Sequence, residues 1–503
     1  MSKRLLLPGG LVLLKFFLQY FLVSDVYELH RDEFLHLDQA HHPAWGYFST
    51  PPFTSWISRL IYGLGNSEFW VRFFPALFGA LTLVVVWKLT EELKGNRYAL
   101  ILASLCVLFS PLLRLNGLFQ PNSFDVLAWT SLYYFLVKYL RTGRGKWLYG
   151  MAVCFGLGFL NKYNIMFLLM GLLPALLLSP HRKIFLRKEF YGAVLLAFLV
   201  ILPNLLWQYR HGFPVIHHME LLKKYHLVHI SRADFLKDQL FYLVPALPVF
   251  VASVYGLLFY APFSRYRLFV WSLIFTLGVF TFFKAKSYYA LGLYPVYMAW
   301  GAVYLAEILK SGRRKYLQPV VAGLPVLLLL MIIPLEFPVR TPEQLVEFAK
   351  RKPEWGMHRW EDGKKYPIPQ DFADMIGWKE LAEKTEKIYN ALPEKEEVLI
   401  LCDNYGQAGA INYYTEGRLR ADSFHTDYLG WFDLSKPYRH LIRIKNAGQR
   451  AEEMEETAPL FENALLADSI ANPYAREYKT DIFVFKNARV SINERVREEI
   501  RSY

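Results

Sequence analysis

The sequence predicts a polytopic α-helical membrane protein that carries a small C-terminal α/β domain. Hydrophobic residues make up 54% of the 503 residues, which is above the roughly 45–50% typical of soluble domains. The excess lies before residue 337, in long apolar runs that short charged stretches separate. After residue 336 charged residues become dense and apolar runs shorten. We therefore expect a membrane domain at 1–336 and a soluble domain at 337–503.

About eleven apolar segments approach the roughly 20 residues that a helix needs to cross a bilayer. The first follows Lys3 and Arg4, and no small-x-small cleavage site precedes Asp25. We expect it to be a retained span and not a cleaved signal peptide. The expected spans are 5–23, 69–91, 98–115, 124–140, 147–161, 163–179, 189–208, 237–260, 267–283, 287–308 and 317–335.

Alternate connections between these spans are rich in basic residues, which places them in the cytoplasm by the positive-inside rule. The remaining connections, including the long loop 24–68, then face outward together with everything after residue 336. We expect a multi-pass protein of the cytoplasmic (inner) membrane with its C-terminal domain on the extracytoplasmic, periplasmic side. The basic loops also account for the net charge of +13, so we do not expect a nucleic-acid partner. The basic groups are Lys88, Lys94 and Arg97; Lys138, Arg141, Arg144 and Lys146; His181, Arg182, Lys183, Arg187 and Lys188; Arg265 and Arg267; and Lys310, Arg313, Arg314 and Lys315.

Two regions outside the spans have recognisable local patterns. Residues 53–62 follow Pro51-Pro52 and carry apolar residues at helical spacing, which predicts a helix lying along the membrane interface. In the C-terminal domain, runs at 398–402, 440–444 and 481–485 predict strands, and stretches such as 341–351 and 377–390 predict helices. The segment Asn404–Ala410 is a glycine-containing turn after a strand, and we expect a turn with tight packing rather than a nucleotide site.

Two acidic sites lie at the expected outer ends of spans. Asp32 and Glu33 follow the first span, and Asp125 begins the fourth. Carboxylates at a membrane boundary cost free energy if they enter the hydrocarbon, and two of them on one face could supply a general base and a group that orients it. The alternative is that all three are solvated loop acids.

His36 adds an imidazole to the first acidic site. Asp32 and His36 share a face if their segment is helical, so Asp32, Glu33 and His36 could form a weak divalent metal site. The alternative is interfacial hydrogen bonding or helix capping. The three cysteines have neither zinc-site nor disulfide spacing, and we expect them to be packing residues.

Cations on the expected outer face form the third group. Lys162 lies between two spans with almost no loop, and Lys284 and Lys286 follow another span. They could hold a phosphate whose lipid tail lies in the membrane. The alternative is that they extend towards the headgroups of the outer leaflet.

Six short motifs, in order, resemble those of the lipid-linked-sugar glycosyltransferases of the GT-C fold. The resemblance is closest to the family 39/83 branch, which includes aminoarabinose transferases and protein O-mannosyltransferase relatives, and it covers residues 1 to about 310. The motifs are Asp32-Glu33, Gly46-Tyr-Phe-Ser-Thr-Pro-Pro-Phe53, Phe119-Gln-Pro-Asn-Ser-Phe-Asp125, Leu160-Asn-Lys-Tyr163, Leu202-Pro-Asn-Leu-Leu-Trp207 and Lys284-Ala-Lys-Ser-Tyr-Tyr289.

The resemblance implies an inverting transfer of a sugar from a polyprenyl-phosphate donor to a lipid, glycan or protein acceptor outside the membrane, with no cofactor required. Asp32 is then the catalytic acid/base candidate, Asp125 helps to form the same cavity, and Glu33 supports the site. The resemblance further implies a substrate cavity lined by His36, Tyr47, Tyr288 and Tyr289.

The sequence departs from this pattern at two positions. Some relatives carry an Arg shortly after the acidic pair and a Lys just before the Pro pair, where this chain has Leu35 and Thr50. The expected role of binding the donor phosphate passes to Lys162 and to Lys284 or Lys286.

Two other functions fit parts of the pattern. A transporter or flippase for lipids or lipid-linked sugars, without transferase activity, would need polar residues near the middle of the membrane and paired repeats. An assembly protein that displays residues 337–503 would leave the placement of the acids and lysines unexplained.

Overall fold

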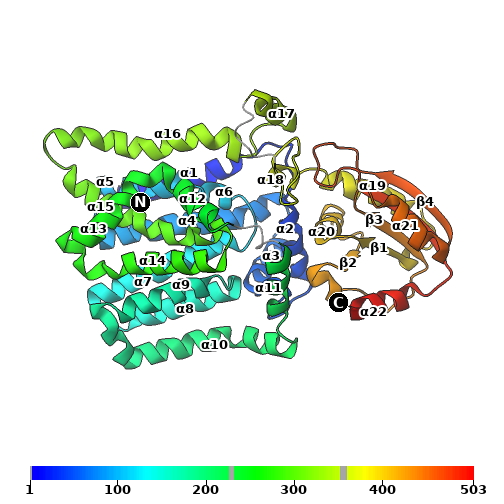
Figure 1. The fold of residues 1–503 in the computed structure, drawn as a ribbon, viewed down its shortest axis with the longest axis horizontal. Coiled ribbons are helices and arrows are strands. Elements are labelled where there is room, and N and C mark those ends of the chain that lie inside the picture. Colours follow the sequence, from blue (N-terminus) through cyan, green and yellow to red (C-terminus); the bar gives the residue numbers. More distant parts are fainter. Residues whose placement is uncertain (1–2, 226–230, 352–358, 503) are drawn as a thin grey trace. The chain divides into compact units, whose positions relative to one another are not determined.

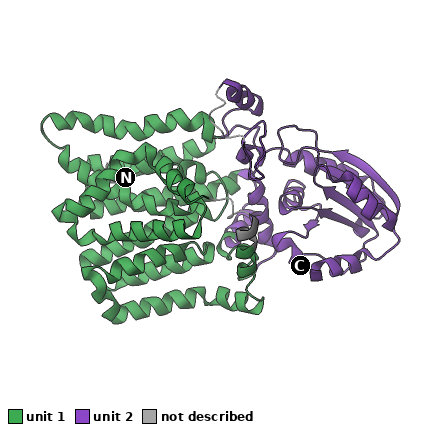
Figure 2. Ribbon diagram, viewed as in Figure 1, with its two compact units in different colours: residues 1–22, 44–54, 69–337 green, residues 23–43, 55–68, 338–503 purple. Residues whose placement is uncertain are grey.

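The computed structural model describes residues 3–225, 231–351 and 359–502. The chain divides into two compact units (Figure 2). The first, which we call the helical unit, comprises residues 1–22, 44–54 and 69–337, and the second, the sheet unit, comprises residues 23–43, 55–68 and 338–503. The helical unit ends at residue 337, and the expected division into a membrane domain at 1–336 and a soluble domain at 337–503 stays a prediction. Most of the loop 24–68 differs, because it belongs to the sheet unit and not to the membrane domain.

The helical unit has a helix, or consecutive helices, at each of the eleven expected spans (Figure 1). Such segments form helices because, in an apolar environment, only a helix satisfies every backbone polar group within one segment. Its α-helices are α1 (Lys3–Phe21), α4 (Glu68–Glu92), α5 (Arg97–Leu108), α6 (Leu112–Leu115), α7 (Asn122–Thr142), α8 (Lys146–Asn161), α9 (Ile165–Leu177), α10 (Lys188–Arg210), α11 (Pro214–Tyr225), α12 (Arg232–Leu243), α13 (Leu247–Phe259), α14 (Leu268–Phe283), α15 (Tyr294–Ile308) and α16 (Gln318–Glu336).

Four helical segments in the described part of the chain are long and apolar enough to cross a membrane by themselves. A bent pair, 165–177 with 180–186, would make a fifth if it is one span. The expected number of about eleven crossings therefore stays a prediction. The four segments are Glu68–Glu92, Lys188–Arg210, Arg232–Phe259 and Gly312–Glu336.

Neighbouring helices in this unit pack side by side (Figure 1). α8 lies between α7 and α10, α9 packs on α14, and α15 packs on α5 and α13. At Gly301 an added Cβ would lie 1.9 Å from the carbonyl oxygen of Val249. The glycine therefore allows α13 and α15 to approach closely, as small residues do between membrane helices. Large aromatic side chains, among them Trp129 and Trp300, are fully buried between the helices.

In the described part of the sheet unit, five strands form one sheet in the order β2-β1-β3-β5-β4 (Figure 1). β1 pairs in parallel with β2 and β3, whereas β5 is antiparallel to β3 and β4. The strands expected at 398–402, 440–444 and 481–485 are confirmed as β1, β3 and β5, and the sequence did not predict the other two. The strands are β1 (Val398–Cys402), β2 (Ala421–Ser423), β3 (His440–Lys445), β4 (Phe461–Ser469) and β5 (Asp481–Ala488).

Helices cover the sheet and complete the unit. Apolar residues of β1, β3 and β5 pack with Ile492 and Val496 of α22 in one core. The helix expected near 53–62 is confirmed as α3. The helices are α2 (Arg31–Asp38), α3 (Phe53–Gly63), α17 (Pro342–Arg351), α18 (Gln370–Ala373), α19 (Trp378–Asn390), α20 (Tyr405–Tyr414), α21 (Arg450–Thr457) and α22 (Ile492–Ser502).

The contact between α2 and α20 joins the first loop to the C-terminal part of the chain within the sheet unit. An added Cβ at Gly406 would lie 2.6 Å from Cγ of Arg31, and one at Gly409 would lie 2.6 Å from Cβ of Phe34. Asn404 caps α20, because its side-chain oxygen accepts hydrogen bonds from the amides of Gly406 and Gln407. The tight packing expected at Asn404–Ala410 is therefore confirmed. The expected turn is wrong, because residues 405–410 form the start of α20.

Candidate active site

Asp32 and Glu33 lie in the first turn of α2, where exposed backbone amides need acceptors. The side chain of Glu33 accepts a hydrogen bond of 2.6 Å from the amide of His30. Nδ1 of His30 in turn accepts one of 3.2 Å from the amide of Asp32. This reciprocal arrangement is a capping box. Glu33 is buried, with 1% of its surface exposed, so this candidate already serves to begin the helix.

The carboxylate of Asp32 is bound to the C-terminal part of the sheet unit. The hydroxyl of Tyr405 donates a hydrogen bond of 2.6 Å to Oδ1 of Asp32. The guanidinium of Arg31 lies 4.5 Å from the centre of the Tyr405 ring. Burial raises the pKa of Asp32, but His30, the Tyr405 hydroxyl, Arg31 and His36 together outweigh burial, so the pKa lies below its ordinary value. Asp32 is thus an ionised carboxylate at neutral pH.

His36 lies on the same helix, one turn after Asp32, and is buried. Its Nδ1 is 3.5 Å from Oε1 of Gln39, and its backbone carbonyl accepts a hydrogen bond of 2.6 Å from Ser58. Burial lowers the pKa of His36 more than Asp32 and Gln39 raise it, which favours the neutral ring. Among the described residues no three His, Cys, Asp or Glu side chains form a metal-binding group. The metal site considered for Asp32, Glu33 and His36 therefore has no geometric support.

Asp125 lies in the first turn of α7 in the helical unit, and it is buried. Its Oδ1 accepts a hydrogen bond of 2.9 Å from Nε1 of Trp129, and its Oδ2 accepts one of 2.8 Å from Nδ2 of Asn164. The same Asn164 nitrogen is 3.0 Å from the carbonyl oxygen of Tyr289. Two donors thus fix the carboxylate, and Asn164 ties it to the segment that follows α14.

Lys162 directly follows α8 as its C-cap and lies in the same cluster as Asp125. Its Nζ donates a hydrogen bond of 2.7 Å to Oδ1 of Asn122. The ammonium also lies 3.9 Å from the centre of the Tyr289 ring and 5.3 Å from that of Tyr288, at distances typical of cation–π contacts. The structure therefore brings four predicted residues together in the helical unit: Asp125, Lys162, Tyr288 and Tyr289.

The segment with Tyr47 packs into the same unit. The backbone amide of Tyr47 donates a hydrogen bond of 3.0 Å to the carbonyl of Thr50. An added Cβ at Gly46 would lie 2.4 Å from the Trp207 ring, and the rings of Phe53 and Phe124 stack at 4.0 Å. Sequence motifs far apart in the chain, at 46–53, 119–125 and 202–207, therefore meet here.

The two other candidate lysines lie near the end of α14. Lys284 follows this helix in a left-handed conformation with φ 54, and Lys286 precedes the 3₁₀ turn Ser287–Leu293. That Lys284 and Lys286 contact a donor phosphate stays a prediction.

Several polar partners were missed from the sequence. Asn122 lies within the motif 119–125, and Asn164 directly follows the motif 160–163. These amide side chains near Asp125 and Lys162 were the signal that could have identified them as hydrogen-bond partners. Tyr405 gave no such signal, because its contact with Asp32 joins residues that are 373 positions apart.

Part of the chain matches known families in sequence. Residues 49–207 match the family model described as dolichyl-phosphate-mannose-protein mannosyltransferase. A 195-residue stretch is 28% identical to the lipid A galacturonosyltransferase RgtD of Rhizobium johnstonii, over 37% of this chain and 40% of that protein. An uncharacterized protein of Aquifex aeolicus is 27% identical over 195 residues, which are 38% of each chain. These matches span about two fifths of the length of the curated relatives.

The structural similarity to solved proteins covers much more of the chain than these sequence matches do. The crystal structure of ArnT from Cupriavidus metallidurans bound to undecaprenyl phosphate aligns with a TM-score of 0.62. The alignment covers 98% of this chain and 99% of that chain at 13% identity. The apo form of the same ArnT aligns with a TM-score of 0.60 at 14% identity, over 95% of this chain and 98% of that chain. The shared fold extends along nearly the whole chain and supports the expected helical membrane fold, whereas the expected number of crossings and the type of the C-terminal domain stay predictions.

Proposed function

We propose that this chain, a membrane protein with the GT-C fold of the aminoarabinose transferase and protein O-mannosyltransferase branch, is an inverting glycosyltransferase. It moves a sugar from a polyprenyl-phosphate donor to a lipid, glycan or protein acceptor at the outer face of the membrane. The observation that carries the proposal is the fold shared over 98% of the chain with ArnT, whose crystal structure holds undecaprenyl phosphate. The match of residues 49–207 to the mannosyltransferase family supports it. The partial match to a lipid A galacturonosyltransferase favours a glycolipid among the acceptors.

In this proposal Asp32 takes the proton from the acceptor hydroxyl. Its pKa lies below the ordinary value, so the carboxylate is ionised and able to accept a proton. The acceptor oxygen attacks the anomeric carbon as the bond from that carbon to the phosphate oxygen breaks. The configuration at the sugar therefore inverts. A phosphate is already a good leaving group, and one general base is enough to assist the displacement.

We assign the donor phosphate to Lys162, supported by Lys284 or Lys286. The Lys162 ammonium is positioned by Asn122 and by the Tyr289 ring, so little rotamer entropy remains to be lost on binding. A fixed cation stabilises the negative charge that develops on the departing phosphate. Asp125 positions the cluster through Asn164. No metal or other cofactor is required in this scheme.

The test uses the purified full-length protein in lipid nanodiscs with undecaprenyl-phosphate-linked sugars and a lipid A-type acceptor. Mass spectrometry of the products is expected to show sugar transfer that EDTA does not abolish. Asp32→Asn is expected to abolish transfer while the protein stays monodisperse. The matched control is Asp25→Asn, which changes an exposed acid in the same loop. Normal turnover by the Asp32 variant would exclude Asp32 as the base.

The transporter alternative finds no support among the relatives with known names. The same nanodisc material can be tested against it in vesicles, with a labelled lipid-linked sugar. Movement of the label across the bilayer without any glycosylated product would favour the transporter and contradict the transferase.

A further inference from the structure

The sheet unit contains a cavity of about 1170 Å³ whose polar end lies at the carboxyl ends of β1 and β3. The chain passes from β1 to β2 on one side of β1 and then to β3 on the other side. In open sheets with parallel strands, ligands bind in the crevice at such a reversal of strand order. The proposed transferase chemistry uses none of the strand-end residues here.

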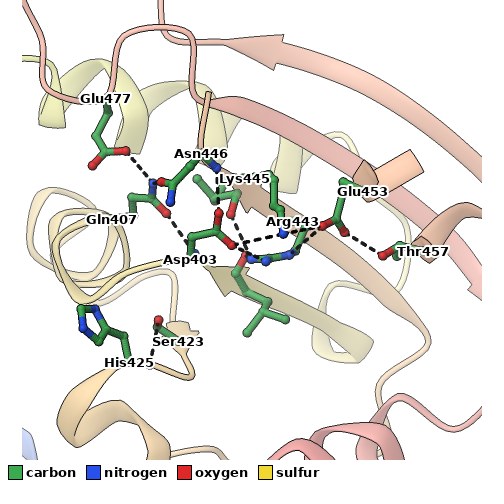
Figure 3. A network of polar contacts seen from close by, with 12 residues as sticks. Asp403, Gln407, Ser423, His425, Arg443, Lys445, Asn446, Glu453, Thr457 and Glu477 are labelled. Atoms are coloured by element: carbon green, nitrogen blue, oxygen red, sulfur yellow. Dashed lines mark hydrogen bonds and ion pairs between the residues drawn. The ribbon is translucent and has the colours of Figure 1, made fainter. Parts of the chain in front are cut away.

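A network of charged and amide side chains forms the polar end (Figure 3). Asp403, just after β1, pairs with Arg443 and accepts a hydrogen bond of 2.8 Å from the amide of Asn446. Lys445 lies 3.3 Å from Glu453, which also accepts a hydrogen bond of 2.8 Å from Thr457. Each member is therefore held in place before any ligand arrives.

An amide side chain extends this network towards a second acid (Figure 3). Nε2 of Gln407 donates hydrogen bonds of 2.9 Å to Oδ1 of Asn446 and 2.6 Å to Oε2 of Glu477. The hydroxyl of Thr480 donates another of 2.9 Å to the same Glu477 oxygen. Asn446, Glu477 and Thr480 line the cavity, whose surface therefore carries an amide, a carboxylate and a hydroxyl that the buried Gln407 helps to hold.

The charges of the cavity disfavour an anionic ligand. Carboxylates outnumber arginines and lysines among the described lining residues. The amides at the start of α20, which would bind a phosphate in a nucleotide site, are already occupied by Oδ1 of Asn404 at 3.0 and 3.1 Å. The cavity thus favours a ligand rich in hydrogen-bond donors and free of phosphate or carboxylate.

A flat aromatic pair belongs to the lining. The rings of Trp360 and Tyr366 stack with 3.7 Å between their centres. Nε1 of Trp360 donates a hydrogen bond of 2.9 Å to the carbonyl of Ile368, which fixes the indole. The Arg476 guanidinium, also in the lining, lies 5.9 Å from the centre of the Trp360 ring. Aromatic rings in a cavity with amide, hydroxyl and carboxylate groups are complementary to a pyranose, whose C–H groups pack on the rings while its hydroxyls bond to the polar groups.

We propose that this cavity is a binding site for a neutral or amine-bearing saccharide, separate from the residues proposed for transfer. Hydroxyl and ammonium groups of the sugar donate to the acids and amides at the strand ends, and the sugar ring packs on Trp360. Binding does not require turnover, so the site stands or falls independently of the proposed transferase activity.

The experiment is saturation-transfer difference NMR on the full-length protein in detergent micelles. Glucose and glucosamine are the probes, and glucuronic acid and glucose 6-phosphate are the anionic comparators. We expect signals from at least one probe and weaker signals from both comparators. Trp360→Ala is expected to weaken probe binding by roughly threefold to tenfold, which is the value of one good aromatic contact, whereas Trp360→Phe retains most of it.

Two further variants make the result decisive. Trp431→Ala is the matched control, because Trp431 lines a different cavity of the same unit and its loss is expected to leave probe binding unchanged. Asn446→Ala keeps the backbone contact to Asp403 and removes one exposed amide, so it tests the polar end even if Trp360→Ala fails to fold. Absence of signal from both probes overturns the proposal. Tighter binding of the anionic sugars, or probe binding unaffected by both the Trp360 and Asn446 changes, also overturns it.

Discussion

The hydroxyl of Tyr405 donates a 2.6 Å hydrogen bond to Oδ1 of Asp32, across 373 positions of the sequence. Tyr405 is the first residue of α20, and Asp32 lies in the first turn of α2. The bond stabilises the ionised form of the carboxylate, and it is one of the interactions that outweigh burial in setting the pKa of Asp32. The C-terminal part of the chain therefore influences the acid that we propose as the base.

Removing this bond is expected to change the pH dependence of transfer. In Tyr405→Phe the pKa of Asp32 rises, because the ionised form loses a donor. The carboxylate then becomes protonated at a higher pH, so the acid limb of the rate profile shifts to higher pH. Transfer rates measured over pH for the wild type and the variant check this. Tyr413→Phe removes a hydroxyl from the same helix, whose hydrogen bond goes to the carbonyl of Asn66, and is expected to leave the limb in place. Coincident limbs for all three proteins would contradict the role of Tyr405.

Replacing Lys162 is expected to weaken use of the donor. A hydrogen bond to a charged group contributes about 1.5–3 kcal/mol, so Lys162→Gln should lower kcat/KM for the polyprenyl-phosphate sugar by roughly 10- to 150-fold. Steady-state kinetics at varied donor concentration provide the measurement. Lys88→Gln is the control, because Lys88 is exposed and pairs with Glu91. If the two lysine variants have the same donor kinetics, Lys162 does not bind the phosphate.

Asp38 is expected to make the sheet unit less stable as the pH rises. Burial raises the pKa of Asp38 to about 7, against the opposing effects of Tyr428, Asn412 and Arg420. The folded state therefore holds a proton that the unfolded state has already lost between about pH 4 and pH 7. The contribution of Asp38 to the free energy of unfolding is fully present below the ordinary pKa of an aspartate and is lost as the pH rises through 7.

Thermal unfolding at pH 5 and pH 8 measures the effect. We expect the midpoint to fall from pH 5 to pH 8 in the wild type and to fall less in Asp38→Asn. Burial also raises the pKa of Asp422 to about 7, so changing both acids should flatten the dependence further. Asp25→Asn, at an exposed acid, should reproduce the wild-type dependence. If the unfolding midpoint of the Asp38 variant falls from pH 5 to pH 8 as much as that of the wild type, the proton on Asp38 does not contribute to the pH dependence of stability.

Gly409 is expected to be intolerant of even a methyl group. An added Cβ would lie 2.6 Å from Cβ of Phe34 and 2.8 Å from the Tyr428 hydroxyl. Overpacking of this kind typically costs about 1–3 kcal/mol, so Gly409→Ala should lower the unfolding midpoint. At Gly430 an added Cβ would meet no atom within 4 Å, and Gly430→Ala should have little effect. Equal midpoints for the two variants would mean that α2 moves freely away from α20.

The sequence predicted those elements whose pattern is local. The spans are long apolar runs, and β1, β3 and β5 are shorter apolar runs that are largely buried. β2 has only three residues, and β4 exposes much of its length with the sequence Phe-Glu-Asn-Ala-Leu-Leu-Ala-Asp-Ser. Neither presents a run or an alternation that distinguishes a strand from a loop.

The candidate site divides in the same way. Lys162 and Asp125 were predicted because charged residues stand out at the ends of apolar spans, whereas Tyr288 and Tyr289 were predicted from the resemblance to the glycosyltransferase motifs. The capping role of Glu33 depends on the backbone of His30, and the environment of Asp32 depends on Tyr405. The first contact is local, between residues three positions apart, and helix capping was one of the alternatives for this segment. The contact with Tyr405 follows from the packing of distant helices, and one sequence carries no signal for it. The assignment of residues 23–43 and 55–68 to the sheet unit follows from the same long-range packing.

The packing of α2 on α20 also sets an order of events during biosynthesis. Phe34 of α2 is fully buried, and its ring contacts those of Trp378, Tyr413 and Tyr414. A ribosome adds about 5–20 residues per second, so the nascent chain carries Phe34 for roughly 20–70 s before the first of these partners is made. The sheet unit consequently cannot mature as its first segment emerges, and a chain that stops before Trp378 leaves the Phe34 ring without its aromatic partners.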